Sequence, residues 1–559
     1  MRPDRLRPVL AFTVSFCSAV LAQTGTVHTG TAPGSVRLSS GWTRSLTAQP
    51  DGRLWCLVRE LDGSGTPAGS HLLLFASTDQ GGTWTQITDV PTIGDNRGAI
   101  AAGRDCDRLH VAWTATDTGS YQNLYHQVFD TTTSTWIGTP ELLLAGTNAN
   151  DQYYCNDISV TAQGTIGIAF NTHRTPTLAG FTSWSGGIFV RRSADTSFQG
   201  PYRCNTDSYG MLANMQAIGE VFHLCFRTNA GLYGIRYRAF DAAQLQFTTA
   251  ADLPLYGANQ SNMRATNSSS IAADGDGNLY ILYSVGSPNP AGGALEIAFA
   301  SPTTGYSTWT TSLVEADPTL TAGNVTYQHY TLARTSGGVF AVFAKAGESF
   351  QNLYARILTP DPVTGGALVT PPASTSAIPL LLTTEADTFQ LVDGLRAEAV
   401  LNDAMVVWSG VPSSQPAGQV TFLATGTTAR TVDWGISCQG NLAEAPVLRG
   451  LNTPNAGSTF TLEIAAAPAN AGTVLAAGLT CLLPPIDLTA QGFPGCTFYF
   501  APVASSFLVT GSAGTATSTI TVPSGLGNGF EIQYGALVLA PGANAGGAVF
   551  SNAVSVHFQ

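Results

Sequence analysis

Charged side chains are scarce in this chain of 559 residues. Asp, Glu, Lys and Arg together make up 11% of the sequence, Lys345 is its single lysine, and the formal net charge is −12. A protein that binds nucleic acid needs a basic surface to neutralise phosphates. The sequence therefore argues against a nucleic-acid partner.

Long apolar runs and helical patterns are also lacking. Beyond residue 22 no stretch approaches the roughly 18 apolar residues that can span a bilayer, and no segment keeps a helical period. Residues 1–22 have the pattern of an export signal, because Arg2, Arg5 and Arg7 precede an apolar run and small residues that end at Ala22. We expect a secreted protein, released or held at the cell surface, with no membrane span.

Close CxxC pairs, which most zinc sites require, are absent. Eight of the nine cysteines follow the export signal, and an oxidising compartment favours disulfides between them. An even number permits complete pairing, so we expect disulfides of open connectivity and neither a metal nor another cofactor. The eight residues are Cys56, Cys106, Cys155, Cys204, Cys225, Cys438, Cys481 and Cys496.

What the chain does contain is a repeat. A five-residue β-run, usually preceded by a turn with Gly or Asp, recurs every 55 to 65 residues. The 60 glycines fit many short strands joined by tight turns. Each unit is long enough for about four strands, which is one blade of a β-propeller. The runs begin at Leu54, Leu109, Ile166, Phe222, Leu279, Val339 and Ala404.

One unit carries a sharper motif. Ser77, Asp79, Gly81, Thr83 and Trp84 match the Asp-box pattern S-x-D-x-G-x-T-W at every fixed position. We expect the aspartate to accept backbone N–H bonds, the glycine to take a positive φ, and the tryptophan to pack between neighbouring sheets. By this motif the chain resembles the sialidase-like (BNR/Asp-box repeat) β-propeller family.

The pattern changes near Pro416, where the repeats give way to alternating strands rich in Ala, Gly and Thr. We expect an export signal at 1–22, an Asp-box propeller at 23–415 and a C-terminal accessory β-sandwich at 416–559. The fold class is all-β. Seven units are counted, the last being the most divergent, so the sequence predicts a six- or seven-bladed propeller.

Loops at the same place in each repeat gather on one face of a propeller. The residues just after the five-residue runs include Arg59, Arg174, Arg227 and Lys345. Because arginine can bind a carboxylate with two parallel hydrogen bonds, this set indicates an anionic ligand. The alternative is that these are solvated loop side chains. We expect a monomer whose partner is an anionic glycan or polysaccharide.

Three stretches extend the resemblance to sialidases: 42–84, 214–227 and 327–343. The resemblance implies that Arg44 and Arg227 bind the sugar carboxylate and that Asp62 is the general acid/base. It further implies that Tyr330, or else Tyr327, attacks the anomeric carbon, since sialidases use a tyrosine nucleophile in place of a second carboxylate.

The chain departs from the sialidase pattern at the third arginine of the triad. That residue is missing from the fifth unit unless Arg97, Arg174 or Arg264 replaces it. His329 adjoins Tyr330, and such a pair beside arginines also fits β-elimination on a uronic-acid polymer. Three hypotheses therefore remain open: a sialidase-like hydrolase, a polysaccharide lyase, and a propeller that binds glycan or protein without chemistry.

Other conspicuous residues are expected to be structural. His110 and His223 occupy the same place in two blades and are read as strand residues. Asp274 and Asp276 are read as a blade turn and not as a calcium site. Core positions are expected for Trp42, Trp113, Trp184 and Trp408.

Overall fold

The computed structural model describes most of the chain after residue 22. The export signal lies outside the described residues, as do Asp62, Arg174, Tyr327 and Trp42. Within the described part, no helix is long and apolar enough to cross a membrane. The described residues are 23–31, 35–38, 44–61, 70–91, 97–116, 122–148, 151–173, 176–206, 210–228, 234–255, 264–286, 293–317, 329–335, 338–345, 352–381, 389–394, 399–401, 405–410, 419–424, 429–525 and 530–558.

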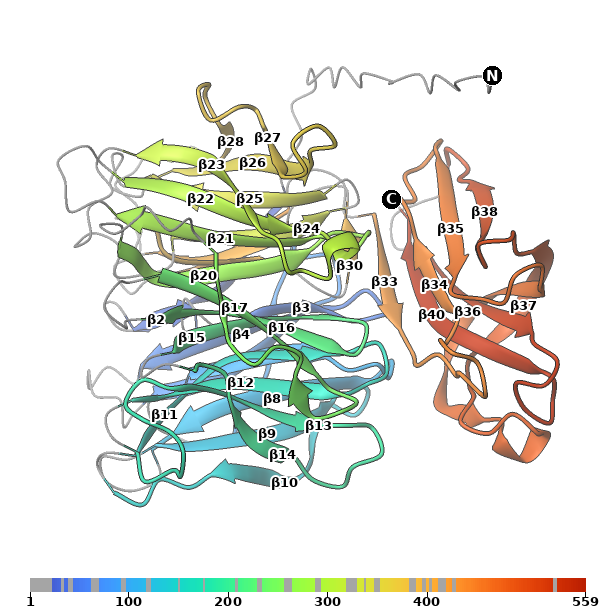
Figure 1. Ribbon diagram of the computed structural model, residues 1–559, viewed down its shortest axis with the longest axis horizontal. Helices are drawn as coiled ribbons and strands as arrows, with labels where there is room; N and C mark the ends of the chain where they lie inside the picture. The colour runs from blue at the N-terminus through green and yellow to red at the C-terminus, as the bar shows by residue number, and fades with distance from the viewer. Residues whose placement is uncertain are drawn as a thin grey trace.

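The fold is all-β, and seven sheets of four or five antiparallel strands follow one another along the chain (Figure 1). Sheet 1 contains β2 (Val36–Leu38), β3 (Leu46–Ala48), β4 (Leu54–Leu61), β5 (Ser70–Ser77) and β6 (Thr85–Asp89). Sheet 2 contains β7 (Arg97–Ala102), β8 (Arg108–Ala115), β9 (Asn123–Asp130) and β10 (Thr135–Leu144). Sheet 3 contains β11 (Gln152–Val160), β12 (Ile166–His173), β13 (Gly186–Arg191) and β14 (Gln199–Arg203). Sheet 4 contains β15 (Met211–Ile218), β16 (Val221–Thr228), β17 (Gly234–Asp241), β18 (Gln246–Phe247) and β19 (Leu253–Pro254).

The remaining three sheets of this series follow the same plan. Sheet 5 contains β20 (Arg264–Ala273), β21 (Leu279–Gly286), β22 (Gly293–Ala300) and β23 (Thr310–Asp317). Sheet 6 contains β24 (Tyr330–Thr335), β25 (Gly338–Ala344), β26 (Leu353–Pro360), β27 (Ala367–Thr370) and β28 (Ile378–Leu381). Sheet 7 contains β29 (Phe389–Gly394), β31 (Met405–Gly410), β32 (Gln419–Ala424) and β1 (Gln23–Thr29). Two short 3-10 turns, η2 (Pro302–Thr304) and η4 (Thr489–Gln491), are also described.

The first strands of the seven sheets form a closed circuit of contacts. The contacting pairs are β3 with β7, β7 with β11, β11 with β15, β15 with β20, β20 with β24, β24 with β29, and β29 with β2. Each five-residue run found in the sequence lies on, or begins just before, the second strand of a sheet, where both faces are covered by neighbours. A closed series of sheets of this kind is consistent with a β-propeller.

The run that begins at Leu54 shows why these segments are apolar at every position. Leu54, Cys56 and Val58 belong to a core cluster shared with sheet 7. Trp55 and Leu57, which alternate with them, belong to the cluster shared with sheet 2. Successive side chains of a strand point to opposite faces, so a strand buried on both faces has no polar position.

The Asp-box has the geometry expected from its sequence. Asp79 Oδ1 accepts the Thr83 N–H at 2.8 Å, and Ser77 Oγ accepts the Gly81 N–H at 2.7 Å. Gly81 has a φ of 97°, and the Trp84 ring packs against Phe422 of sheet 7 with 5.5 Å between ring centroids. Burial alone would raise the pKa of the Asp79 carboxyl, but hydrogen bonds from Thr83 and Ser77 outweigh it and lower the pKa. The motif therefore fastens sheet 1 to sheet 7.

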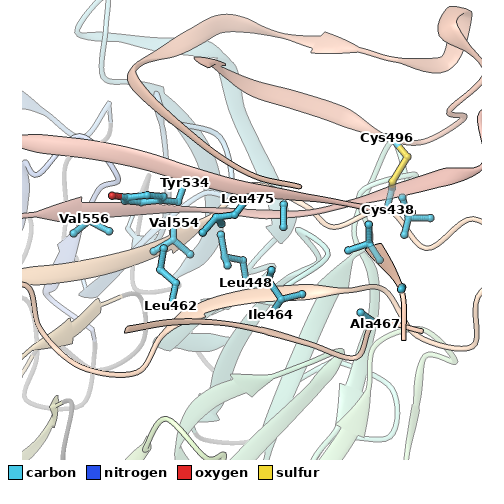
Figure 2. Packing of buried hydrophobic residues seen from close by; sticks show 14 of the residues in the cluster. Cys438, Leu448, Leu462, Ile464, Ala467, Leu475, Cys496, Tyr534, Val554 and Val556 are labelled. Carbon is cyan, nitrogen blue, oxygen red and sulfur yellow. A yellow bond between two sulfur atoms is a disulfide. The ribbon is translucent and has the colours of Figure 1, made fainter. Parts of the chain in front are cut away.

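Two further sheets lie at one end of the strands of the series, at the right in Figure 1. The larger sheet contains β30 (Ala399–Leu401), β33 (Arg430–Trp434), β36 (Gly472–Asp487), β37 (Thr497–Val509), β39 (Glu531–Leu539) and β40 (Ala548–His557). The smaller sheet contains β34 (Val447–Gly450), β35 (Thr459–Ala465) and β38 (Ala516–Thr521). Leu448, Leu462 and Ile464 from the smaller sheet pack against Tyr534 and Val554 from the larger one (Figure 2).

These C-terminal sheets are bonded to the hairpins that follow the first strands of the series. The Gly435 N–H donates to the Arg104 carbonyl at 2.7 Å, and the Arg104 Nη1 donates to the Asp433 carbonyl at 3.0 Å. Arg449 Nη1 donates to the Gly275 carbonyl at 2.8 Å. We call this end of the strands the hairpin face.

Two disulfides are formed, Cys106–Cys481 between sheet 2 and the C-terminal part and Cys438–Cys496 within the C-terminal part. The expectation of disulfides is confirmed for four of the eight cysteines, and the other four are buried thiols carried by sheets 1, 3 and 4 and the segment that follows β14. Burial raises the pKa of the Cys204 thiol to about 12. The four are Cys56, Cys155, Cys204 and Cys225.

Candidate functional site

The predicted site residues lie mostly at the end of the strands opposite the hairpin face. Arg97 begins β7, and Gln152 at the start of β11 pairs with His173 at the end of β12. Arg227, near the end of β16, pairs with Met211 at the start of β15. We call this end of the strands the strand-start face.

Sheets 2 and 3 bring a cationic and three aromatic side chains together on the strand-start face. The Arg97 guanidinium carbon lies 3.9 Å from the centroid of the Tyr154 ring. The His173 ring is tilted against Tyr154 at 5.4 Å, and the Trp184 ring meets His173 edge-on at 3.8 Å. All four residues are partly exposed. We call these four residues the aromatic cluster.

Hydrogen bonds orient the histidine of the aromatic cluster. His173 Nδ1 donates to Gln152 Oε1 at 2.5 Å, since an amide oxygen can only accept. The Tyr154 hydroxyl lies 3.5 Å from the same oxygen. The two rings are therefore held in one arrangement by a single glutamine.

Asp151 anchors the chain immediately before the aromatic cluster. Its carboxylate accepts the Thr147 hydroxyl at 2.6 Å and the Thr177 N–H at 2.8 Å. Burial, the largest single influence, would raise the pKa of Asp151, yet the hydrogen bonds from Thr147 and Thr177 together lower it. The carboxylate is therefore ionised at neutral pH and ties the loop before β11 to the loop after β12.

The tryptophan of the aromatic cluster, Trp184, has a strained backbone conformation. Trp184 has a φ of 61°, a conformation that residues other than glycine rarely adopt. Its carbonyl accepts the Gly210 N–H at 2.7 Å, which fixes the turn that precedes β13. The prediction that Trp184 is a core residue is wrong, whereas Trp113 and Trp408 are buried as predicted. Strained positions of this kind are frequent at binding sites.

Arg44 does not lie on the strand-start surface. Its side chain and that of Asp157 are both 0% exposed, and Arg44 Nε lies 3.2 Å from Asp157 Oδ1. Arg44 Nη2 also donates to the Met215 carbonyl at 3.0 Å. A ligand carboxylate cannot contact Arg44 in this arrangement, because none of its side chain is accessible.

Tyr330 and His329 are also buried, with exposed fractions of 4% and 6%. The Tyr330 hydroxyl accepts the Ser284 N–H at 3.2 Å and lies 3.3 Å from Ser284 Oγ. Both predicted residues belong to sheet 6, whereas the aromatic cluster belongs to sheets 2 and 3. The predicted nucleophile Tyr330 therefore lies on a sheet that is not adjacent to the sheets carrying the aromatic cluster.

The remaining predicted residues are distributed around the strand-start face. Arg59 lies near the end of β4 in sheet 1 and Arg227 in the same place in sheet 4, and both are partly buried. Lys345 follows β25 and lies 3.4 Å from Glu315 of sheet 5. Among the predicted binding arginines, Arg97 contacts the aromatic cluster through Tyr154.

The structural readings of several other residues are confirmed. Asp274 Oδ1 accepts the N–H groups of Asp276 and Asn278 at 3.0 and 2.9 Å, as a blade turn requires. His110 and His223 lie within strands and are mostly buried, with His223 2.7 Å from the Tyr237 hydroxyl.

No protein-family model matches the chain, and no curated protein matches it either. Among solved structures, a polysaccharide lyase of the PL25 ulvan lyase type is 9% identical, with a TM-score of 0.43, covering 71% of this chain and 96% of its own. An α-L-arabinofuranosidase from Fusarium graminearum is 9% identical, with a TM-score of 0.40 and the same coverage of 71% and 96%. A Hadza microbial sialidase is 14% identical, with a TM-score of 0.36, covering 56% and 64%. These likenesses are weak, so the function proposed for this chain rests on its own residues.

Proposed function

We propose that the chain is a secreted glycan-binding protein built from a seven-bladed β-propeller and a C-terminal β-sandwich. The propeller takes residues 23–424, because β32 pairs with β31 and β1 and so belongs to the last blade. The sandwich takes residues 429–558. Two disulfides support an extracellular location, since such bonds persist in oxidising compartments.

The observation that carries the proposal is the partly exposed aromatic cluster. The apolar face of a sugar ring packs on aromatic side chains, while nearby polar groups bond its hydroxyls. Tyr154, His173 and Trp184 provide ring surface at one place, and Gln152 and Asp151 fix the strand that carries Tyr154. A surface of this kind is already arranged for its ligand, which lowers the entropic cost of binding.

The glycan is proposed to be acidic. Arg97 is held against the Tyr154 ring, where its guanidinium would meet a carboxylate on a sugar stacked beside that ring. Asp151 lies three residues before Tyr154, and its oxygens accept hydrogen bonds from Thr147 and Thr177. In this proposal the cluster presents the Arg97 cation to an acidic sugar beside a ring surface.

The proposal is binding without hydrolysis. A sialidase needs an accessible arginine cluster and a tyrosine that can reach the anomeric carbon. Arg44 is inaccessible beside Asp157, and the Tyr330 hydroxyl accepts the Ser284 N–H. These contacts support a surface that recognises a glycan and leaves its bonds intact.

The test is a glycan array and calorimetry on the mature protein, using sialylated and uronic-acid oligosaccharides beside their neutral counterparts. Tyr154→Ala and Trp184→Ala should each weaken binding of the acidic probes by about tenfold or more. Arg97→Gln should weaken binding of the acidic probes and spare that of the neutral ones. Phe507→Ala, at a C-terminal phenylalanine that is 64% exposed, is the matched control and should bind as the wild type does.

Two outcomes would overturn the proposal. If no probe binds, or if binding survives both Tyr154→Ala and Trp184→Ala, the aromatic cluster is not a glycan site. If the wild type releases fluorophore from a fluorogenic sialoside, and Tyr330→Phe abolishes that release, the protein is a hydrolase and the reading of Tyr330 as structural is wrong.

A further inference from the structure

A recess lies on the hairpin face, at the opposite end of the strands from the aromatic cluster. It is a cleft of about 570 Å³ between the hairpins of sheet 3 and the C-terminal sheets. Gln163 and Ser193 line it from sheet 3, and the segments 436–441, 494–499 and 543–544 contribute the other wall. Ligand sites occur preferentially where two domains meet, and this volume is within the usual range of roughly 300 to 1,000 Å³.

The lining of this interdomain cleft mixes apolar and polar groups and carries no charge. None of its lining residues is Asp, Glu, Lys, Arg or His, although the chain as a whole has a net charge of −12. Side-chain amides come from Gln163, Gln439, Asn441 and Asn544, and hydroxyls from serine, threonine and tyrosine. Such a surface has no partner for a charged ligand, and its amides suit a ligand rich in hydroxyl groups.

The amides of the C-terminal wall are held by their nitrogen atoms. Gln439 Nε2 donates to the carbonyls of Leu442 and Ala443 at 2.6 and 2.8 Å, and Asn441 Nδ2 donates to the Gly542 carbonyl at 3.4 Å. Within the described part of the chain, no donor is bonded to Gln439 Oε1 or Asn441 Oδ1. Two fixed carbonyl oxygens thus remain as acceptors for ligand hydroxyls.

The C-terminal wall of the interdomain cleft is cross-linked. The Tyr499 hydroxyl accepts the Ile436 N–H at 2.7 Å and donates to the Ile436 carbonyl at 3.2 Å. The Cys438–Cys496 disulfide lies within the C-terminal wall, and Cys106–Cys481 fastens that wall to sheet 2. Pre-organised walls lower the cost of ordering side chains on binding.

We propose that the interdomain cleft binds a neutral oligosaccharide of about two or three sugar units. A neutral sugar matches the uncharged lining, its hydroxyls match the fixed amide oxygens, and its size matches the volume. This site is separate from the aromatic cluster, which is proposed to take an acidic glycan. The two together would let one molecule hold two different glycans.

The experiment is calorimetry and saturation-transfer NMR on the full mature protein with cellotriose, xylotriose, laminaritriose and mannotriose, and with trigalacturonic acid as the charged comparison. At least one neutral trisaccharide should bind, and Ser193→Trp, which fills the cleft from an exposed position, should weaken that binding by about tenfold or more. Ser505→Trp, the same change at an exposed serine of β37, should leave binding unchanged. Gln439→Ala should weaken binding without moving the midpoint of thermal unfolding.

Tyr154→Ala separates this site from the aromatic cluster. It should leave binding of the neutral trisaccharide intact, whether or not it removes binding of acidic glycans. The proposal is overturned if none of the four neutral probes binds, or if Ser193→Trp binds them as the wild type does. It is also overturned if Tyr154→Ala abolishes their binding while Ser193→Trp does not, since the neutral sugar would then belong to the aromatic cluster.

Discussion

Arg44 and Asp157 form an ion pair in which neither side chain is exposed, with 3.2 Å between Nε and Oδ1. Arg44 precedes β3 in sheet 1, whereas Asp157 lies in β11 of sheet 3. The other oxygen of Asp157 accepts the Met215 N–H of sheet 4 at 2.9 Å. One carboxylate therefore links the first strands of three sheets. Its charge is balanced by Arg44, the residue that the resemblance to sialidases implied would bind the sugar carboxylate.

Removing one partner of this pair should destabilise the fold severely. Asp157→Asn leaves the Arg44 guanidinium buried without its counter-charge, and the free energy of unfolding should fall by about 3 to 5 kcal/mol. Urea unfolding followed by tryptophan fluorescence measures the change. Asp195→Asn, at a partly exposed pair with Arg192, is the control and should leave the midpoint near that of the wild type. Equal midpoints for the two variants would show that the buried pair is dispensable.

Gly81 of the Asp-box should tolerate no side chain. Its φ is 97°, and a Cβ at this position would lie 2.1 Å from the Phe422 ring of sheet 7. Gly81→Ala combines a strained backbone with overpacking, so unfolding should require about 2 to 4 kcal/mol less free energy. Gly219→Ala is the matched control, because its φ is 55° and nothing lies within 4 Å of the added Cβ. A loss no greater than in the control would mean that the contact with Phe422 is easily relieved.

Local features of this fold could be predicted from the sequence, because they repeat along it. The run at Leu54 is apolar since both faces of its strand are covered, and the Asp-box at Asp79 bonds within its own turn. Pairing between distant segments left no such pattern. β1 closes sheet 7 by pairing with β32, and no local feature marked residues 419–424 as the last strand of the series.

The candidate site was harder to predict, because its side chains meet only in three dimensions. Tyr154 is one of two adjacent tyrosines in β11, and alternation puts Tyr153 in the core and Tyr154 near the surface. Nothing in the sequence around Trp184 indicates its positive φ or its partly exposed side chain. Arg44 matched a family pattern, yet burial beside Asp157 depends on the packing of three sheets.

His223 should make stability depend on pH. Burial lowers the pKa of its imidazole to about 3, below the ordinary value of about 6.5 that applies in the unfolded chain. The unfolded state therefore binds more protons below about pH 6.5, so the stabilisation present above that pH is lost as the pH falls toward 3. His223→Gln should be less stable than the wild type at pH 7.5, and the gap should narrow by about 2 kcal/mol at pH 5. Urea unfolding at the two values measures it, and a gap that stays constant would show that His223 is not neutral in the fold.

The Cys106–Cys481 disulfide should couple the unfolding of the propeller to that of the C-terminal sheets. It joins residues 375 positions apart, and Cys106 packs with Trp434, Tyr499 and Phe500 where the two parts meet. Replacing both cysteines by serine removes the constraint on the unfolded chain, and the C-terminal part should lose about 2 to 5 kcal/mol of stability. Calorimetry should then resolve two transitions, with the C-terminal one at the lower temperature.

The double serine variant of Cys438–Cys496 is the control, because it weakens the C-terminal part while keeping the bond to sheet 2. A single unshifted transition in the Cys106–Cys481 variant would mean that hydrogen bonds such as that of Gly435 to Arg104 hold the two parts together on their own.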